Sequence, residues 1–502
     1  MEGESTNWRI LRNEKVGRYV VAGRDLQPGE IIFSEVPFVY GPKADTPPLC
    51  LGCYTPADGT TLCSKCGWPV CGPECEENPA HKNAECKVFS AAGVRFQSVE
   101  DATIPCPQYE CITHLRLLLA KESKPERWET EVKIMEPHNE LRKKFPVWGI
   151  NQVNIVDFLL GPCNLKDRCD EELLHTICGI IEINAFEGRS ATGYAIRAIY
   201  PKLAMMSHNC VSNTTHSIVP INENGEEFRM YVRASVKVPE NEELFASYTY
   251  SLSPTMLRRE HLREGKYFDC ECNRCADPTE LGTHMSTLKC TKCDNGVVLS
   301  TNSLDRDAQW KCTHCEFSAR GPTIRKVLQT IQAELDMIEI TGQDSQGIEE
   351  REKIFRKYRS VLHPRHAFMT ILRHSLSQMY GRMDGYMLED LPDILLERKV
   401  ELCKQLLQVI DVVEPGHSRL RGMTLYELHA PLILLARNLQ RAGAIDKASL
   451  KTKLEESLNL LEGAATILSL EPPSAPEGII GQVAAQSLQQ LKENINILVE
   501  QA

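Results

Sequence analysis

The spacing of the cysteines is the feature that most constrains how this chain can fold. Twenty-one cysteines occur, and most of them, with one histidine, fall into three groups of close pairs separated by loop-sized intervals. Such pairs suit tetrahedral zinc, because each pair occupies one edge of the tetrahedron and the intervening loop closes it. The first group comprises Cys50, Cys53, Cys63, Cys66, Cys71, Cys75, His81 and Cys86; the second comprises Cys270, Cys272 and Cys275; the third comprises Cys290, Cys293, Cys312 and Cys315.

A disulfide framework is the alternative explanation of so many cysteines. The sequence shows no N-terminal apolar signal stretch and no apolar run long enough to span a bilayer. We therefore expect a reducing compartment, in which paired cysteines bind metal rather than form disulfides, and we expect no membrane partner.

Each cysteine group predicts its own metal arrangement. The eight ligands of the first group can serve two zinc ions in an interleaved way, with the first and third pairs on one ion and the second and fourth on the other. Interleaving suits a segment too small for its own apolar core, because metal binding supplies the folding free energy. The third group predicts one structural zinc with no open coordination position. Six cysteines fit no ligand set and are expected to be free thiols, mostly buried: Cys106, Cys111, Cys163, Cys169, Cys178 and Cys403.

Length and charge limit the classes of function. With 502 residues, the chain is long enough for about three domains. Its apolar content of 42% and charged content of 25% are ordinary for a globular protein. The net charge of −11 argues against direct binding of nucleic acid, which needs an excess of cations to displace phosphate counterions.

The remaining patterns divide the chain into β-rich and helical parts. Strands are predicted for 18–22, 30–34, 217–219 and 228–232. Helices are predicted for 111–120, 129–145, 171–183, 394–413 and 425–441, and an apolar stripe at helical spacing covers 324–338. The proline-rich run 471–477 interrupts the last helices.

Three separated motifs carry a family resemblance. They are Val16-Gly-Arg-Tyr19, Met206-Ser-His-Asn-Cys210, and Glu242-Glu-Leu-Phe-Ala-Ser-Tyr248, which is followed by Tyr267-Phe-Asp-Cys270-Glu-Cys-Asn-Arg-Cys275. Together they resemble a SET methyltransferase core with its post-SET region, and the first cysteine group resembles a MYND zinc finger. A MYND finger inserted after the first SET strands is the arrangement of the SMYD family. The third cysteine group and the residues of the three motifs resemble the arthropod-specific SmydA group most.

The resemblance implies an α+β multidomain fold. It has a β-rich SET core with an inserted MYND finger and a helical insert, a cysteine-rich post-SET, a zinc ribbon and an all-α TPR-like C-terminal domain. The expected boundaries are 1–49 for the SET N-terminal strands, 50–86 for the MYND finger, 87–178 for the helical insert, 179–250 for the SET core, 251–275 for the post-SET, 276–320 for the zinc ribbon and 321–502 for the helical domain.

The resemblance also implies transfer of a methyl group from S-adenosylmethionine to a lysine amine. Alignment in a dry, narrow channel does most of this chemistry, and Tyr248 matches the tyrosine that orients the amine. The residues assigned to the cofactor are Gly17, Arg18, Tyr19, Asn184, Ser207, His208, Tyr248 and Phe268. Those assigned to the lysine channel are Ala185, Phe186, Lys266 and Tyr267. Cys210 is expected to join Cys270, Cys272 and Cys275 on one zinc, which brings the expected total to about four ions.

Departures from the family pattern leave two functional hypotheses open. Tyr19 replaces a glycine, Ser207 replaces an asparagine and Lys266 stands where a tyrosine is expected, so that either the loop shifts by one residue or the channel is altered. His81 and Cys86 are one residue farther apart than is usual. The first hypothesis is a protein-lysine methyltransferase of cytoplasm and nucleus, acting on a histone or non-histone protein, whose MYND finger binds proline-containing peptides. The alternative is a catalytically weak or inactive adaptor that recruits proline-motif partners, for example in transcriptional repression.

Overall fold

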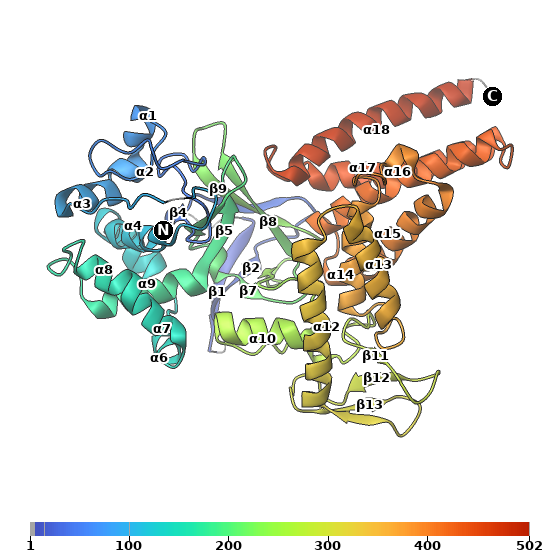
Figure 1. Cartoon of the computed structure of the whole chain (residues 1–502), viewed down its shortest axis with the longest axis horizontal. Helices are drawn as coiled ribbons and strands as arrows, with labels where there is room; N and C mark the ends of the chain where they lie inside the picture. Colours follow the sequence, from blue (N-terminus) through green and yellow to red (C-terminus); the bar gives the residue numbers. More distant parts are fainter. Residues whose placement is uncertain (1–5, 15, 100, 501–502) are drawn as a thin grey trace.

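The computed structural model describes residues 6–14, 16–99 and 101–500. Figure 1 shows a β-rich centre, with the finger and the helical insert on one side and the C-terminal helices on the other. The small sheet that follows the centre lies below the C-terminal helices in the same view. None of the helices in the described ranges combines the length and apolarity that crossing a membrane requires. The architecture is the multidomain α+β fold that the sequence predicts.

Short antiparallel sheets and one parallel pair form the centre. The strands are β1 (Trp8–Asn13), β2 (Gly17–Ala22), β3 (Ile31–Glu35), β4 (Val39–Pro42), β5 (Ala185–Arg189), β6 (Ala195–Ile199), β7 (Ser207–His208), β8 (Thr214–Ile221), β9 (Glu227–Ala234) and β10 (Phe245–Ala246). They pair as β1-β2, β3-β9-β8, β4-β6-β5 and, in parallel, β7-β10. Every second residue of β9 is buried, which is the period expected of a strand with one face on the core.

The finger packs onto this core instead of standing apart from it. Its helices are α1 (Pro73–Glu76), α2 (Pro79–Lys82) and α3 (Glu85–Ala92). Trp68 is buried and stacks on Phe89 with ring centroids 4.6 Å apart, and both belong to the main apolar cluster. Apolar burial therefore adds to any stability that metal binding supplies.

The helical insert contains one correction to the predicted helices. Its elements are η1 (Pro107–Tyr109), α4 (Glu110–Ser123), α5 (Pro125–Arg127), η2 (Trp128–Val132), α6 (Asn139–Arg142), α7 (Pro146–Asn151), η3 (Gln152–Val156), α8 (Asp157–Leu160) and α9 (Glu171–Asn184). The predicted helix over 129–145 is wrong, because the chain leaves helical structure between η2 and α6. Pro137 lies in this gap, where it cannot donate a helical hydrogen bond. Its carbonyl approaches α9 so closely that a Cβ on Gly179 would lie 2.3 Å away.

The second half of the chain agrees with its predicted pattern. A 3-10 turn, η4 (Leu203–Met205), precedes β7, and the helices α10 (Thr255–Lys266) and α11 (Asn273–Ala276) lead into the ribbon sheet β11 (Leu288–Lys289), β12 (Val297–Ser300), β13 (Gln309–Cys312) and β14 (Ser318–Arg320). The C-terminal elements are α12 (Gly321–Thr341), α13 (Gln346–Tyr358), α14 (Ala367–Met379), η5 (Leu388–Asp390), α15 (Asp393–Val413), α16 (Arg419–Arg441), α17 (Lys447–Leu468) and α18 (Pro476–Glu500). The apolar stripe of α12 packs against the ribbon, where Val298 joins its cluster.

Candidate functional site

The parallel pair β7-β10 brings His208 and Tyr248 together from segments forty residues apart. The Tyr248 backbone N–H donates to His208 Nδ1 at 3.0 Å, and the two rings lie 5.2 Å apart. The Tyr248 hydroxyl donates to the carbonyl of Met206. Since Nδ1 accepts, a neutral His208 carries its proton on Nε2, which lies 3.3 Å from Cys210 Sγ. A tyrosine, a histidine and a cysteine thus form one connected unit.

Cys210 lies with the second cysteine group, and we call this set the core site: Cys210, Cys270, Cys272 and Cys275. The Cys210 sulfur lies 3.9 Å from that of Cys270 and 3.5 Å from that of Cys275. Thiolates bound to zinc at about 2.3 Å lie about 3.8 Å apart at tetrahedral angles. The donor set and its spacing therefore fit one zinc ion.

Three fully buried charges support the core site. Arg258 of α10 donates from Nε to Cys210 Sγ at 3.3 Å and from a terminal nitrogen to Cys275 Sγ at 3.5 Å. Glu280 pairs with Arg258 at 2.7 Å and with Arg274 at 2.9 Å, and all three side chains are 0% exposed. Burial alone would raise the pKa of Glu280, but the two guanidinium groups outweigh it and hold the pKa at about 2. The sequence analysis did not find this network.

The other three predicted ligand sets are also brought together. In the first group, Cys50, Cys53, Cys71 and Cys75 form one set, and Cys63, Cys66, His81 and Cys86 form the other. The ribbon site consists of Cys290, Cys293, Cys312 and Cys315. Representative separations are 3.6 Å between the sulfurs of Cys53 and Cys71, 3.7 Å between Cys66 Sγ and His81 Nε2, and 3.6 Å between the sulfurs of Cys290 and Cys315. Each set could hold one zinc ion, in the interleaved order that the sequence predicts. The six cysteines predicted as free thiols are all buried and lie outside these sets.

His81 has a partner that the sequence analysis missed. Its Nδ1 lies 2.8 Å from a carboxylate oxygen of Glu85, which in turn receives two hydrogen bonds, at 2.7 and 2.6 Å, from Arg116 of α4. A carboxylate behind a ligating histidine fixes the ring orientation and strengthens the ligand. The spacing of His81 and Glu85, four residues apart, is the one signal that could have indicated the contact.

Three of the residues assigned to the cofactor, Gly17, Arg18 and Tyr19, lie in the first hairpin. Gly17 has φ +72°, which favours glycine, and a Cβ there would meet no atom within 4 Å. Arg18 and Tyr19 follow in β2 with partly buried side chains. The hairpin is joined to the segment before β10, because Leu244 N–H donates to the Val20 carbonyl at 2.8 Å. This brings Gly17 into the same part of the core as Tyr248.

The end of α9 and the start of β5 carry the next assigned residues. The Asn184 amide donates to the carbonyls of Ile180, at 3.1 Å, and Glu136, at 3.4 Å. Ala185 and Phe186 open β5, and the Phe186 ring lies 6.0 Å from that of His216 in β8. These contacts direct Phe186 toward β8.

The last residue of α10, Lys266, lies beside Tyr248. Lys266 Nζ lies 5.6 Å from the centroid of the Tyr248 ring. Tyr267 has φ +59° and contacts the insert instead, with its ring 5.3 Å from His138 and 5.8 Å from Phe145. The Phe268 ring lies 6.0 Å from His208 and is 36% exposed. The structure thus places the side chain of Lys266 beside Tyr248 and directs that of Tyr267 to the insert.

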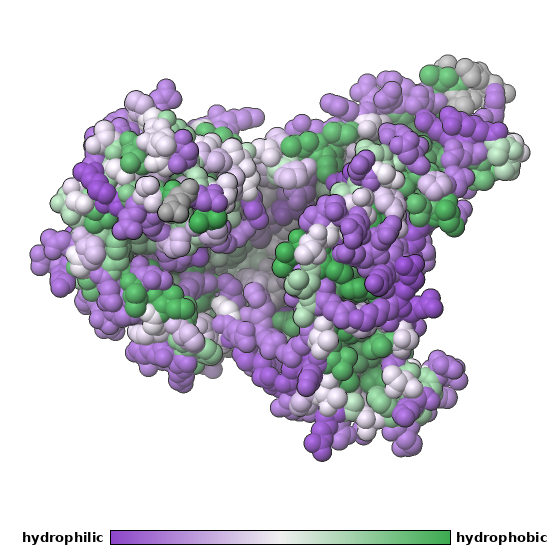
Figure 2. Space-filling view, viewed as in Figure 1, coloured by the Kyte–Doolittle hydropathy of each residue, from purple (hydrophilic) through white to green (hydrophobic). Residues whose placement is uncertain are grey.

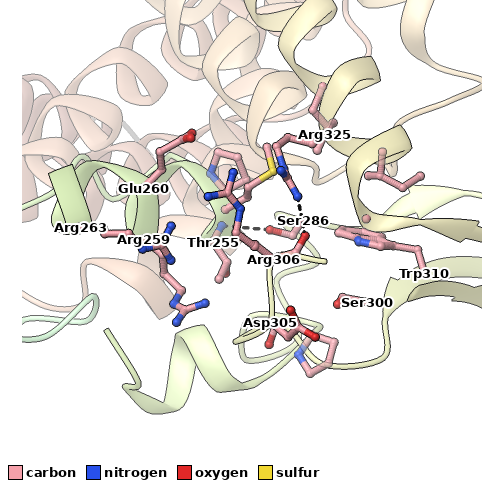
Figure 3. Close-up of a pocket in the computed structure, with 17 residues that line it drawn as sticks. Thr255, Arg259, Glu260, Arg263, Ser286, Ser300, Asp305, Arg306, Trp310 and Arg325 are labelled. Carbon is pink, nitrogen blue, oxygen red and sulfur yellow. Dashed lines mark hydrogen bonds between the residues drawn. The ribbon is translucent and has the colours of Figure 1, made fainter. Parts of the chain in front are cut away.

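Two cavities lie beside the elements that carry these residues, one next to α10 and one next to β5 and β8. Figure 3 shows a pocket between α10, the ribbon and α12, lined by Arg259, Trp310 and Arg325 among others. Its volume of about 60 Å³ is too small for a drug-sized ligand, and none of the predicted cofactor or channel residues lines it. A larger cavity of about 500 Å³ lies between β5, β8 and the segment joining α17 to α18, where Figure 2 shows the surface hollowed.

Comparison with known proteins gives one family model and several relatives. The SET domain model matches residues 17–249, an interval that contains the finger, the insert, Gly17 and Tyr248. The chain is 30% identical over 323 residues to the SET domain-containing protein SmydA-8, isoform A, of Drosophila melanogaster, a match that covers 62% of this chain and 66% of that protein. It is 27% identical over 282 residues to the N-lysine methyltransferase SMYD2-B of Xenopus laevis, covering 53% of this chain and 60% of that one.

A plant relative extends the likeness into the C-terminal helices. The histone-lysine N-methyltransferase ASHR1 of Arabidopsis thaliana is 21% identical over 469 residues, covering 86% of this chain and 88% of its own length. The matches to the two animal proteins cover less than two thirds of those proteins, whereas the plant match covers nearly the whole of both chains.

Proposed function

We propose that this chain, which is similar to SET-domain proteins of the SMYD family and of the arthropod SmydA group, is an S-adenosylmethionine-dependent protein-lysine N-methyltransferase. The observation that carries the proposal is the unit formed by Tyr248, His208 and Cys210. It joins the tyrosine assigned to the reaction, the histidine assigned to the cofactor and a ligand of the core site through contacts at 3.0 and 3.3 Å.

When bound, the cofactor would supply a methyl group on a sulfonium, whose carbon–sulfur bond breaks as the new carbon–nitrogen bond forms and whose electron pair remains on sulfur. The protein aligns the reactants, since the attack needs a neutral amine and no strong base. Tyr248 directs its hydroxyl proton to Met206, which leaves the oxygen free to accept a hydrogen bond from the target amine. Burial raises the pKa of Tyr248 to about 12, so the phenol stays protonated at neutral pH.

Calorimetric titration of the zinc-loaded protein with S-adenosylmethionine and with its demethylated product tests the cofactor pocket. Saturable one-to-one binding is expected, and no binding by a folded protein with full zinc content would contradict the proposal. Tyr248→Phe should abolish methyl transfer to lysine peptides and keep cofactor binding. Tyr250→Phe is the matched control, because Tyr250 lies two residues farther along and is 51% exposed.

We also propose that the four ligand sets hold zinc ions. Support comes from the donor types and from sulfur separations that match tetrahedral thiolates. Elemental analysis of the purified protein should give about four zinc ions per chain. Two or fewer would contradict the assignment.

A second candidate function is the adaptor without turnover. One observation favours it: the ammonium of Lys266 lies over the ring of Tyr248, where the reaction would need space for a target amine. Cofactor-dependent labelling of any lysine peptide by the wild type, lost in Tyr248→Phe, would exclude this function.

The finer properties of the protein follow from the family resemblance. We propose that the finger binds proline-containing peptides and that the protein works in cytoplasm and nucleus. The segment 50–86 exposes Cys53 and Cys71 at its surface, so the ligand set that contains them faces solvent. Titration with proline-rich peptides, with Cys53→Ser as the variant expected to lose binding, tests the first part. Microscopy of the tagged protein tests the second.

A further inference from the structure

Lys266 is the last residue of α10, and its side chain points toward the site. Tyr267 ends the helix in the left-handed conformation. The Lys266 ammonium donates to the carbonyl of Ile183, next to the segment 184–186 assigned to the cofactor and channel. The same ammonium lies 5.6 Å from the centroid of the Tyr248 ring. One backbone oxygen and one aromatic face therefore hold it.

This ammonium has no carboxylate partner among the described residues. Burial lowers the pKa of Lys266, and no charge opposes that effect. A cation withdrawn from water without a counter-ion is costly, and a carbonyl together with the face of a tyrosine offsets part of that cost. Structural lysines usually keep their charged end in water, so the placement of Lys266 needs an explanation.

The groups that hold Lys266 are the groups that a target lysine needs. A lysine amine entering a dry channel beside Tyr248 requires an acceptor for its N–H groups and an aromatic wall along its stem. We propose that the Lys266 amine occupies the position of the target amine and competes with the substrate lysine for it. This inference rests on the proposed methyltransferase function. A substrate must displace an internal lysine, so only polypeptides that bind firmly through their flanking residues would be accepted.

Replacing the cation by an unbranched apolar side chain of nearly the same length tests the competition. Lys266→Met should lower the KM for lysine peptides at least tenfold, with a smaller change in kcat, because the competitor is removed and the apolar wall is kept. Lys266→Arg keeps a cation, so it should not lower the KM for lysine peptides. Arg263→Met is the control on the same helix, because Arg263 pairs with Asp269 instead of facing Tyr248.

Three readouts separate this inference from the proposed function. Calorimetry with S-adenosylhomocysteine reports the cofactor pocket in every variant, and melting temperatures report folding. If Lys266→Met folds, binds S-adenosylhomocysteine and transfers methyl groups with an unchanged or higher KM, the inference is overturned and the function stands. If no variant binds S-adenosylhomocysteine, the function fails and the inference fails with it.

Mass spectrometry adds a direct test of where the internal amine lies. Incubation with a methyl-labelled cofactor should place label on Lys266 of the wild type, and not of Tyr248→Phe, because an amine in the target position can itself attack the sulfonium carbon. The new carbon–nitrogen bond replaces the carbon–sulfur bond, and the displaced proton leaves to water. Label on Lys266 that depends on Tyr248 supports the placement. Label that persists in Tyr248→Phe shows nonspecific methylation and counts against it.

Discussion

The core site and the ribbon site each consist of four cysteines, but they differ in burial and in the groups that donate hydrogen bonds to the sulfurs. At the core site, Cys210, Cys270 and Cys275 are buried, and a guanidinium from a separate helix donates to two of the sulfurs. At the ribbon site, all four cysteines are partly exposed. Its sulfurs receive hydrogen bonds from neighbouring backbone N–H groups, those of Lys292, His314 and Cys315. The core site is thus connected to a separate helix, whereas the ribbon site is connected to its own loops.

The difference shows which metal ion is coupled to the candidate active site. Arg274 donates to the carbonyls of Cys210 and Ser251, and the Ser251 hydroxyl donates to Glu414 in the segment after α15. Cys210 also lies beside His208. We therefore expect a disturbance at the core site to reach the residues assigned to the cofactor and the C-terminal helices, and one at the ribbon to reach its sheet and α12.

The largest expected effect on cofactor binding is that of Cys210→Ser. It removes the one core-site ligand that precedes Tyr248 in the chain, and it also removes the sulfur that lies next to His208. We expect loss of one zinc ion and at least about tenfold weaker binding of S-adenosylhomocysteine, which corresponds to about 1.4 kcal/mol. Elemental analysis and calorimetry measure the two quantities. Unchanged cofactor affinity after loss of this zinc would show that the site is not coupled to the pocket.

Arg258→Met should act mainly on the stability of the fold. The variant keeps much of the side-chain volume but leaves Arg274 as the remaining cation paired with Glu280 and removes two donors to sulfur. Removing one partner of a buried ion pair costs about 3–5 kcal/mol, so the melting temperature should fall clearly below that of the wild type. Arg263→Met, at a partly exposed position on the same helix, should change it little. Equal melting temperatures for the two variants would contradict the proposed support of the core site.

The same contrast explains what could be predicted from the sequence. The grouping of ligands followed from the order and spacing of cysteine pairs, because short loops leave few ways to close a tetrahedron. Arg258 could not be found in this way, since a polar residue in α10 has the same local pattern whether it faces water or a thiolate. Its partners, Arg274 and Glu280, come from loop and short-helix segments whose packing only the tertiary fold determines.

Local pattern was also insufficient at two other places. The spacing over 129–145 predicts a helix, but Pro137 and the close packing of its carbonyl against Gly179 interrupt it. At Lys266, the sequence does not show which side chain lies beside Tyr248, because this depends on the turn at Tyr267, whose left-handed backbone directs its ring to the insert. By contrast, the helix predicted over 394–413 nearly matches α15. A long apolar pattern at helical spacing without a proline favours one continuous helix.

In the finger, the ligand set that contains His81 is connected to another element: Glu85 contacts His81 and accepts hydrogen bonds from Arg116 of α4. Glu85→Gln keeps the shape of the side chain but removes the charge that holds both His81 and Arg116. Loss of a carboxylate behind a histidine ligand typically lowers metal affinity about 10–100-fold. Competition with a chelator should therefore release the zinc of the Cys63 set faster, while the core site keeps its metal. Release of both at the wild-type rate would show that Glu85 does not support the ligand.

The smallest effect on the candidate active site is expected from Cys312→Ser. The ribbon should lose its zinc, because a hydroxyl is a weak substitute for a thiolate, and β12 to β14 should become protease-sensitive. Cofactor affinity should stay within about twofold of the wild type, below about 0.4 kcal/mol, since the contacts of the Cys312 sulfur with Cys293, His314 and Cys315 all lie within the ribbon. Limited proteolysis and calorimetry on the same sample measure both effects. A tenfold loss of cofactor affinity here, as large as that in Cys210→Ser, would mean that α12 transmits the change to α10, and the contrast between the two sites would be lost.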